Sequence, residues 1–324
     1  MAARRGPGRR RRAARAPAPT AATARAALAA ACGAGFLWGT GALVVNVLIE
    51  RHGFTPENIS FWRFVVGAVV LLAVFGRRGL WAAVRPLWAR VLGAGTCMAA
   101  YVLLWFLGIE RIGAAIPTLI ALCLPPVLVT LVALLRGQER LDATLVAILA
   151  AALAGTVMIV ARHGGGAGPV AAGDFWVGVA CSVGSAVLYA GFTLVSGGLS
   201  QRLGAGPATT CLTVVAAAVM GLSGLFRPLA WPVEVAPEAW FLYLGVVTAA
   251  LALLAFSWGA ARISPTALTV ATLVEPLTAV LLAALLLGQP RARPDAGHRQ
   301  CGCSTWTTRC TTPAMPPSAR PAPR

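Results

Sequence analysis

A glutamate and an arginine interrupt two long apolar stretches of this 324-residue chain, and they are the first residues that could carry chemistry. Glu275 stands in the middle of an apolar run, within "TLVEPLT". An ionised carboxylate at mid-bilayer costs about 2.5–3.5 kcal/mol on insertion scales, so it should face a cavity or a partner. Glu275 therefore binds a substrate ammonium or a coupling proton, or it is a protonated or arginine-paired carboxylate that fixes helix packing. The residues alone leave both readings open.

Arg63 supplies a matching cation, within "GFTPENISFWRF" at 53–64. In one reading it pairs with Glu275 or grips a substrate carboxylate. In the other, its long side chain snorkels to the membrane interface. Because Arg63 lies only a turn or so inside its apolar run, its position favours the structural reading.

Pro125 and Pro276 each lie near the middle of an apolar run. A proline within a helix removes a backbone donor and weakens the helix locally. The freed carbonyls could line a cavity for substrate contact or serve a hinge, because irregular backbone at membrane depth is tolerated where it lines a cavity. A packing kink is the alternative for both prolines.

Aromatic side chains inside the runs suit the wall of a pocket for moderately apolar metabolites. Taken singly, each is more often a packing residue. Trp258 is the weakest candidate, because it lies close to the end of its run. The candidates are Trp38, Tyr101, Trp105, Tyr189 and Trp258. Gly35 and Gly39 form a G-x3-G pair, which is typical of close helix packing.

The elements that must hold these residues are membrane helices. The chain is 58% hydrophobic and 11% charged, whereas soluble domains are about 25% charged. Several runs exceed the roughly 20 residues that cross a bilayer core, and they do not alternate as barrel strands do. We predict an all-α, polytopic membrane protein with spans at 27–48, 58–76, 90–109, 114–135, 142–161, 176–197, 207–226, 239–260 and 265–288, nine in all.

Composition argues against several functions. The net charge is +17, but eight of the 27 arginines lie in the first 25 residues and six follow Gln289, so we expect no nucleic-acid partner. Lysine is absent, which excludes a lysine Schiff base and the phosphate-binding GxxxxGK[ST] loop. The three histidines lie outside the runs, so we expect no enzyme, no cofactor and no metal. The spacing of His298, Cys301, Cys303 and Cys310 fits no common zinc site.

Arginine also predicts the orientation. With the N-terminus in the cytoplasm, sixteen arginines fall inside and four outside, which is the bias expected of cytoplasmic loops. We therefore expect a multi-pass protein of the cytoplasmic membrane. Residues 1–25 are predicted to form a disordered, arginine-rich cytoplasmic tail near anionic lipid.

The chain repeats itself at an offset of 151 residues. Residues 111–140 match 262–291 at 13 of 30 positions, and the same offset lays 33–44 on 184–195. We predict a five-helix repeat at 26–162 and a four-helix repeat at 175–289, and an odd number of helices per copy inverts the second copy. The offset places a tenth helix at about 293–312, but 290–324 is polar. We expect a disordered tail that replaces that helix, as a reading-frame shift would produce.

These motifs resemble the EamA-like family of the drug/metabolite transporter superfamily. The similarity covers 27–289 and rests on "FLWGTG" (36–41), on Pro56 and Arg63, and on a central proline with a closing Gly-Gln in 114–138 and 265–289. The sequence departs from the family in its missing tenth helix and in Gly288-Gln289-Pro290, where Gly-Glu-Arg is usual. The resemblance implies ten helices in two five-helix repeats.

On this basis we expect a secondary active transporter that exports small metabolites, amino acids or drugs by alternating access between two inverted repeats. Its partners are then a small-molecule substrate and the lipid bilayer. Protons as the coupling ion and a homodimer are open questions. The alternative is a truncated, non-transporting remnant or a membrane assembly protein, because the tenth helix is missing.

Overall fold

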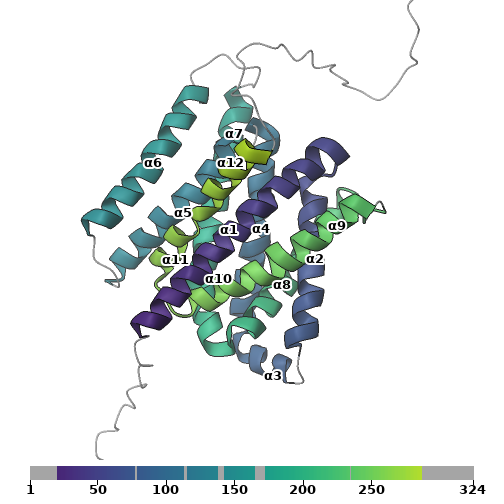
Figure 1. Ribbon diagram of the computed structural model, residues 1–324, viewed down its shortest axis with the longest axis vertical. Coiled ribbons are helices and arrows are strands. Elements are labelled where there is room, and N and C mark those ends of the chain that lie inside the picture. The colour runs from purple at the N-terminus through teal and green to yellow at the C-terminus, as the bar shows by residue number, and fades with distance from the viewer. Residues whose placement is uncertain are drawn as a thin grey trace, which may run out of the picture. The chain divides into compact units, whose positions relative to one another are not determined.

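A computed structural model describes residues 20–76, 79–112, 115–137, 142–164, 172–233 and 235–286, and these residues form helices and turns without a strand (Figure 1). α1 begins at Ala21, so residues 21–25 of the predicted N-terminal tail are helical. The rest of that tail lies outside the described residues. So do the predicted tenth-helix region and its His298, Cys301, Cys303 and Cys310.

Twelve α-helices, two 3-10 segments and one π-helix follow one another along the described chain. The helices are α1 (Ala21–His52), α2 (Pro56–Phe75), α3 (Leu80–Val84), α4 (Trp88–Ile112), α5 (Ala115–Leu135), α6 (Ala143–Gly164), α7 (Ala172–Leu203), α8 (Ala205–Gly221), α9 (Val235–Tyr243), α10 (Ala252–Ala260), α11 (Pro265–Ala271) and α12 (Val274–Leu286). The 3-10 segments η1 (Arg85–Leu87) and η2 (Leu222–Leu225) precede α4 and follow α8, and the π-helix η3 (Leu244–Leu251) joins α9 to α10.

Seven helical stretches in the described chain are long and apolar enough to cross a membrane: Ala21–Ile49, Pro56–Phe75, Leu80–Ile112, Ile116–Leu135, Gly173–Leu203, Ala205–Leu225 and Ala236–Ala260. The prediction of an all-α, polytopic membrane protein is confirmed, but the count of nine spans is not. The 22-residue α6 occupies the predicted fifth span but is not among these seven stretches. The predicted ninth span is interrupted between α11 and α12.

Tight turns join several of the helices. Thr55 caps α2 by accepting a hydrogen bond from the backbone N–H of Asn58, and Pro56 occupies the first helical position, where its missing N–H costs nothing. Gly53 ends α1 in the left-handed conformation, with φ of 69°. Ser264 caps α11 in the same way as Thr55 caps α2. These short caps let successive helices return directly through the bundle.

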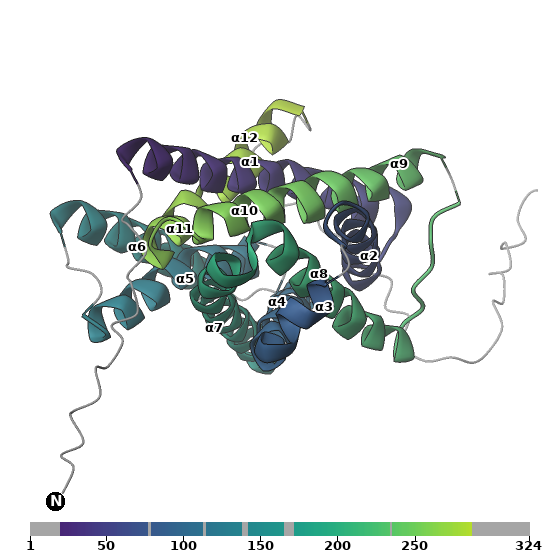
Figure 2. The same cartoon turned by 90° about the horizontal axis from the view of Figure 1, so that it is seen from below.

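Helices of the two sequence copies pack mainly against each other. α1 packs against α10 and α12, and α7 packs against α4 and α5, while α2 packs against α8 (Figure 2). The 151-residue offset places α1 on α7, α4 on η3–α10, and α5 on α11–α12. The packing of α1 against α10 and α12 therefore corresponds to the packing of α7 against α4 and α5. Exchanging the copies leaves this packing pattern unchanged.

The G-x3-G pair of α1 lies against the interruption between α11 and α12. A Cβ on Gly39 would lie 2.6 Å from Thr278 Cβ and 2.7 Å from the Glu275 carbonyl oxygen. A Cβ on Gly35 would lie 3.1 Å from the Thr272 carbonyl oxygen. The predicted role of the pair in close helix packing is confirmed.

Candidate functional site

Four sequence-predicted residues from four helices converge in the helix bundle. Arg63 of α2 interacts electrostatically with Tyr101 of α4 and with Glu275 of α12. Glu275 also interacts electrostatically with Tyr189 of α7. Residues 212 positions apart in the chain are thus brought together, with two of the four helices coming from each copy.

The two charges of this cluster are not paired with each other. The described residues contain three ion pairs, and none includes Arg63 or Glu275. Arg63 Nε is buried and has no hydrogen-bond partner, and the guanidinium lies 5.1 Å from the ring centroid of Phe64. A direct Arg63–Glu275 ion pair, one of the structural readings, is therefore not formed. A buried N–H without a partner costs about 1–3 kcal/mol, so an incoming acceptor would be stabilised there.

A chain of aromatic rings extends from this cluster. Tyr101 lies 5.1 Å from Tyr189 between ring centroids, and Tyr189 lies 6.3 Å from Phe192. Phe192 stacks on Phe256 at 5.7 Å with an interplanar angle of 12°, and Phe256 lies 5.5 Å from Trp38. The structure thus brings together three predicted aromatics, Trp38, Tyr101 and Tyr189, through two phenylalanines that sequence reasoning missed. The i, i+3 spacing of Tyr189 and Phe192 puts both on one helix face and was the available signal.

A π-helical turn holds Trp38 in place. Trp38 Nε1 donates a 2.9 Å hydrogen bond to the Thr248 carbonyl in η3, and the Thr248 hydroxyl donates to the Leu244 carbonyl at 2.6 Å. π-Helical turns alter the backbone ladder and occur frequently at functional sites. A Cβ on Gly41 would lie 2.8 Å from Thr248 Cγ2, so α1 approaches η3 closely here. The sequence carried no sign of this turn.

Pro276 coincides with the break between α11 and α12. It has no N–H to donate to the Thr272 carbonyl, which instead accepts from the Glu275 backbone N–H at 2.9 Å. Glu275 consequently lies in the first turn of α12, where the helix dipole favours a negative charge. Pro125 differs from its repeat counterpart, because α5 continues unbroken through Pro125 and Pro126.

The two sequence copies each match the same known protein family. The sequence profile of the EamA-like transporter family matches residues 25–161 and again residues 176–292. This chain belongs to the EamA-like transporter family. The second match begins 151 residues after the first, which is the offset found by aligning the chain with itself. The membership makes the chain a multi-pass membrane transporter.

This EamA-like transporter is also similar to individual proteins. It is 28% identical over 272 residues to the uncharacterized transporter YwfM of Bacillus subtilis (strain 168), which covers 79% of this chain and 84% of that protein. A solved structure titled "Crystal structure of protein" superposes with a TM-score of 0.63 at 24% identity, over 82% of this chain and 89% of the solved one. That likeness shows the shared fold.

Two predicted aromatics of this EamA-like transporter lie outside the ring chain. Trp105 Nε1 donates to the Thr118 hydroxyl at 3.1 Å, which ties α4 to α5. The Arg262 guanidinium lies 4.0 Å from the Trp258 ring centroid and donates to the Trp258 carbonyl at 2.9 Å. Both the ring and the carbonyl of Trp258 therefore contact Arg262 near the end of α10. This agrees with the weak candidacy that its position close to the end of the run indicated.

Proposed function

We propose that this chain is a secondary active transporter of the cytoplasmic membrane, and that it exports small metabolites, amino acids or drugs by alternating access between two inverted repeats. The N-terminus lies in the cytoplasm in this proposal. The doubled family match and the exchange of packing partners between the two copies support the inverted repeat, because related copies can interchange roles as the central site changes sides.

The contacts at the helix ends support alternating faces for successive loops. Glu57, at the start of α2, pairs with Arg227 just beyond the C-terminal end of α8. Gly204 precedes the other end of α8. The turns near 53–57 and 202–206 are thus separated by the length of α8, as an arrangement with loops on two membrane faces requires.

In this proposal, Arg63 and Glu275 are the charged groups of the central site. Arg63 receives an anionic or acceptor group of the substrate at its unpartnered Nε. Glu275 binds a substrate ammonium or a coupling proton, and the rings from Tyr101 to Trp38 form an apolar wall. The interruption at Pro276 allows α12 to move relative to α11, while Pro125 lies in the more rigid counterpart.

One observation carries the proposal most directly: Arg63 and Glu275, on apolar helices of different sequence copies, interact electrostatically without forming an ion pair. A purely structural pair would be expected to close, because desolvated charges left apart are costly. Charges that are kept apart by the packing remain available to a ligand.

The test is substrate counterflow in proteoliposomes, with a panel of candidate metabolites, amino acids and drugs. Glu275→Gln and Arg63→Gln should each lower the flux of a transported compound at least tenfold while elution and thermal stability are retained. Glu238→Gln at the start of α9 and Arg90→Gln on the exposed face of α4 are the matched controls. Full flux in both site variants would refute the assignment, and absence of flux for every compound would favour the non-transporting alternative.

A further inference from the structure

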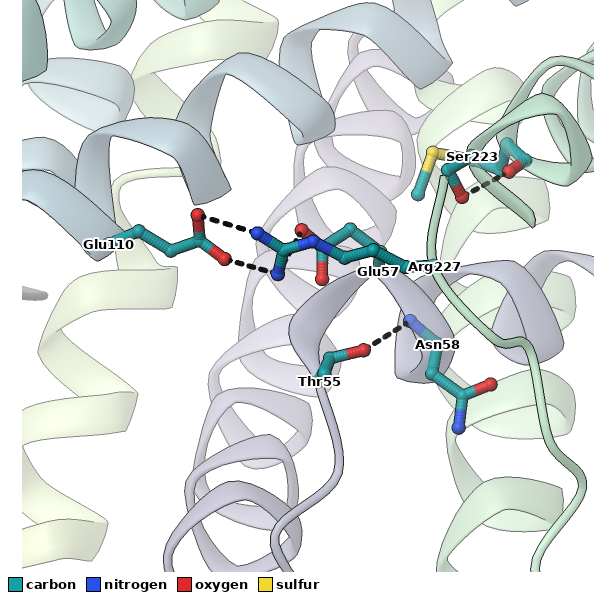
Figure 3. A network of polar contacts seen from close by, with 7 residues as sticks. Thr55, Glu57, Asn58, Glu110, Ser223 and Arg227 are labelled. Carbon is teal, nitrogen blue, oxygen red and sulfur yellow. Dashed lines mark hydrogen bonds and ion pairs between the residues drawn. The ribbon is translucent and has the colours of Figure 1, made fainter. Parts of the chain in front are cut away.

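Arg227 joins the ends of two helices from the other sequence copy (Figure 3). Its Nη1 lies 2.7 Å from Glu110 Oε1 and its Nη2 lies 3.3 Å from Glu110 Oε2, so the contact with the end of α4 is bidentate. The same Nη1 lies 3.4 Å from Glu57 Oε1 at the start of α2. We call Arg227, Glu57 and Glu110 the Arg227 latch. These residues are 53 to 170 positions apart, and sequence reasoning missed them.

The contacts of Arg227 with Glu57 and with Glu110 differ in their exposure to solvent. The Glu57 side chain is 8% exposed, and its Oε2 is buried without a hydrogen-bond partner. The Glu110 side chain is 33% exposed and Arg227 is 45% exposed, so their contact is weakened by solvent. The hydrogen bond to Glu110, together with the charge of Glu57, raises the pKa of Arg227. Arg227 is thus charged and is held on one side by a buried carboxylate.

The loop that carries Arg227 is fastened to α2. Asn58 Nδ2 donates to the Ala230 carbonyl at 2.9 Å, and Trp62 packs edge-on against Trp231 with ring centroids 4.9 Å apart. Glu57 adds its ion pair on the same side. The loop and α2 therefore form one unit, and the bidentate contact with Glu110 is its joint to the end of α4.

This joint lies on the same two helices as Arg63 and Tyr101 of the candidate site, nearer to the helix ends. Arg63 follows Glu57 by six residues on α2, and Tyr101 precedes Glu110 by nine residues on α4. At 1.5 Å per residue, the latch is roughly 9–14 Å along the helix axes from these site residues. Direct packing between α2 and α4 is sparse. α8 packs against both α2 and α4, and the Arg227 side chain, in the segment that follows α8 and η2, joins these two helices at their ends on this face.

The latch has no counterpart in the other half of the repeat. The 151-residue offset places Glu57 on Ala208, Glu110 on Ala261 and Arg227 on Gly76. None of those three residues can form an ion pair. At the Ala261 end, the contact that the structure describes is a hydrogen bond from Gln201 Nε2 to the Ala261 carbonyl, 3.1 Å long. Exchange of the two copies therefore loses the latch.

We propose that the Arg227 latch is a one-sided gate, which closes the path from the Arg63–Glu275 site to the face carrying the 53–55 turn and favours the access state seen here. The gate rests on the proposed transport function. Opening separates the Arg227–Glu110 contact, and Glu57 keeps Arg227 on the α2 side for reclosure. The opposite face, without such a triad, closes by packing and backbone contacts.

Opening of the proposed gate can be measured without a substrate, as the accessibility of a buried residue to a thiol reagent. Ser60 is buried, at 2% exposure, and lies one turn from Glu57 toward the site. In a full-length chain whose eight cysteines are replaced, Ser60→Cys reports access through the labelling rate of a membrane-impermeant thiol reagent. Glu110→Gln should raise that rate about three- to tenfold. This variant keeps the Arg227–Glu57 pair and leaves no buried charge unpaired, so the fold is retained.

The matched control is Arg111→Gln, which breaks the adjacent exposed pair with Asp174 and should leave the labelling rate unchanged. Arg227→Lys should give an intermediate rate, because lysine keeps the charge but cannot bind bidentately. A Glu110→Gln rate within twofold of the parent would overturn the gate, as would equal acceleration by Arg111→Gln. Since no flux is measured, this failure is distinct from failure of the counterflow test.

Discussion

The indole of Trp38 in α1 donates a 2.9 Å hydrogen bond to the backbone carbonyl of Thr248, inside the π-helical turn η3. This bond joins the first helix of one sequence copy to the third helix of the other. It also fixes the end of the ring chain that reaches Tyr101 and Tyr189. A single side chain thereby couples the contact between copies to the wall of the candidate site.

Trp38→Phe should lower the free energy of unfolding by about 0.5–1.5 kcal/mol, because the ring is kept while the bond to the Thr248 carbonyl is lost. Denaturation in detergent micelles measures the change. Trp81→Phe is the matched control, since the Trp81 side chain is 75% exposed. Equal stability of the two variants would show that the Trp38 hydrogen bond contributes nothing.

Gly39→Ala should lower stability by about 1–3 kcal/mol, the usual range for overpacking. Its new Cβ would meet Thr278 Cβ and the Glu275 carbonyl and push α1 away from α12. Gly33→Ala, six residues earlier on α1, meets nothing within 4 Å. Because alanine favours helices by about 0.5–1 kcal/mol over glycine, that control should be neutral or stabilising. Thermal unfolding of both variants measures the difference in stability. A Gly39→Ala variant as stable as the parent would contradict the close approach of α1 to α12.

The sequence predicted much of this architecture because its signals are carried by composition and by repetition. Long apolar runs have one satisfactory backbone arrangement in lipid, which is the helix. Arg63 and Glu275 were evident because charges are rare in such runs, and the 151-residue offset revealed the two copies. Each of these signals is local in the chain or recurs at a fixed distance.

The features that sequence reasoning missed depend on contacts between distant residues. Pro125 and Pro276 align in the repeat, yet α5 continues and α11–α12 is broken, since neighbouring helices decide whether a proline interrupts. The nine-span count treated the Pro276 run as one helix, whereas the structure interrupts it between α11 and α12. The π-turn around Thr248 and the partners of Arg227 are likewise set by tertiary packing, which no window of sequence records.

Pro276→Ala should restore an N–H that can bond to the Thr272 carbonyl and make α11–α12 a continuous helix. We expect the rate of counterflow to fall about three- to tenfold, equivalent to about 1 kcal/mol in the barrier, with stability unchanged or raised. Pro125→Ala is the control, because α5 is already continuous. If Pro276→Ala transported at the parental rate, the break would serve packing alone.

The central claim, that one site is exposed in turn to both membrane faces, is tested most directly by two-sided labelling of Tyr101→Cys in the chain lacking native cysteines. Tyr101 lies beside Arg63 and Tyr189. Val69→Cys is the control, because the Val69 side chain is 61% exposed on the outside of α2. With alternating access, an impermeant thiol reagent should reach position 101 from either side of sealed vesicles, and a transported compound should slow both reactions. Labelling of position 101 from one side only would contradict it.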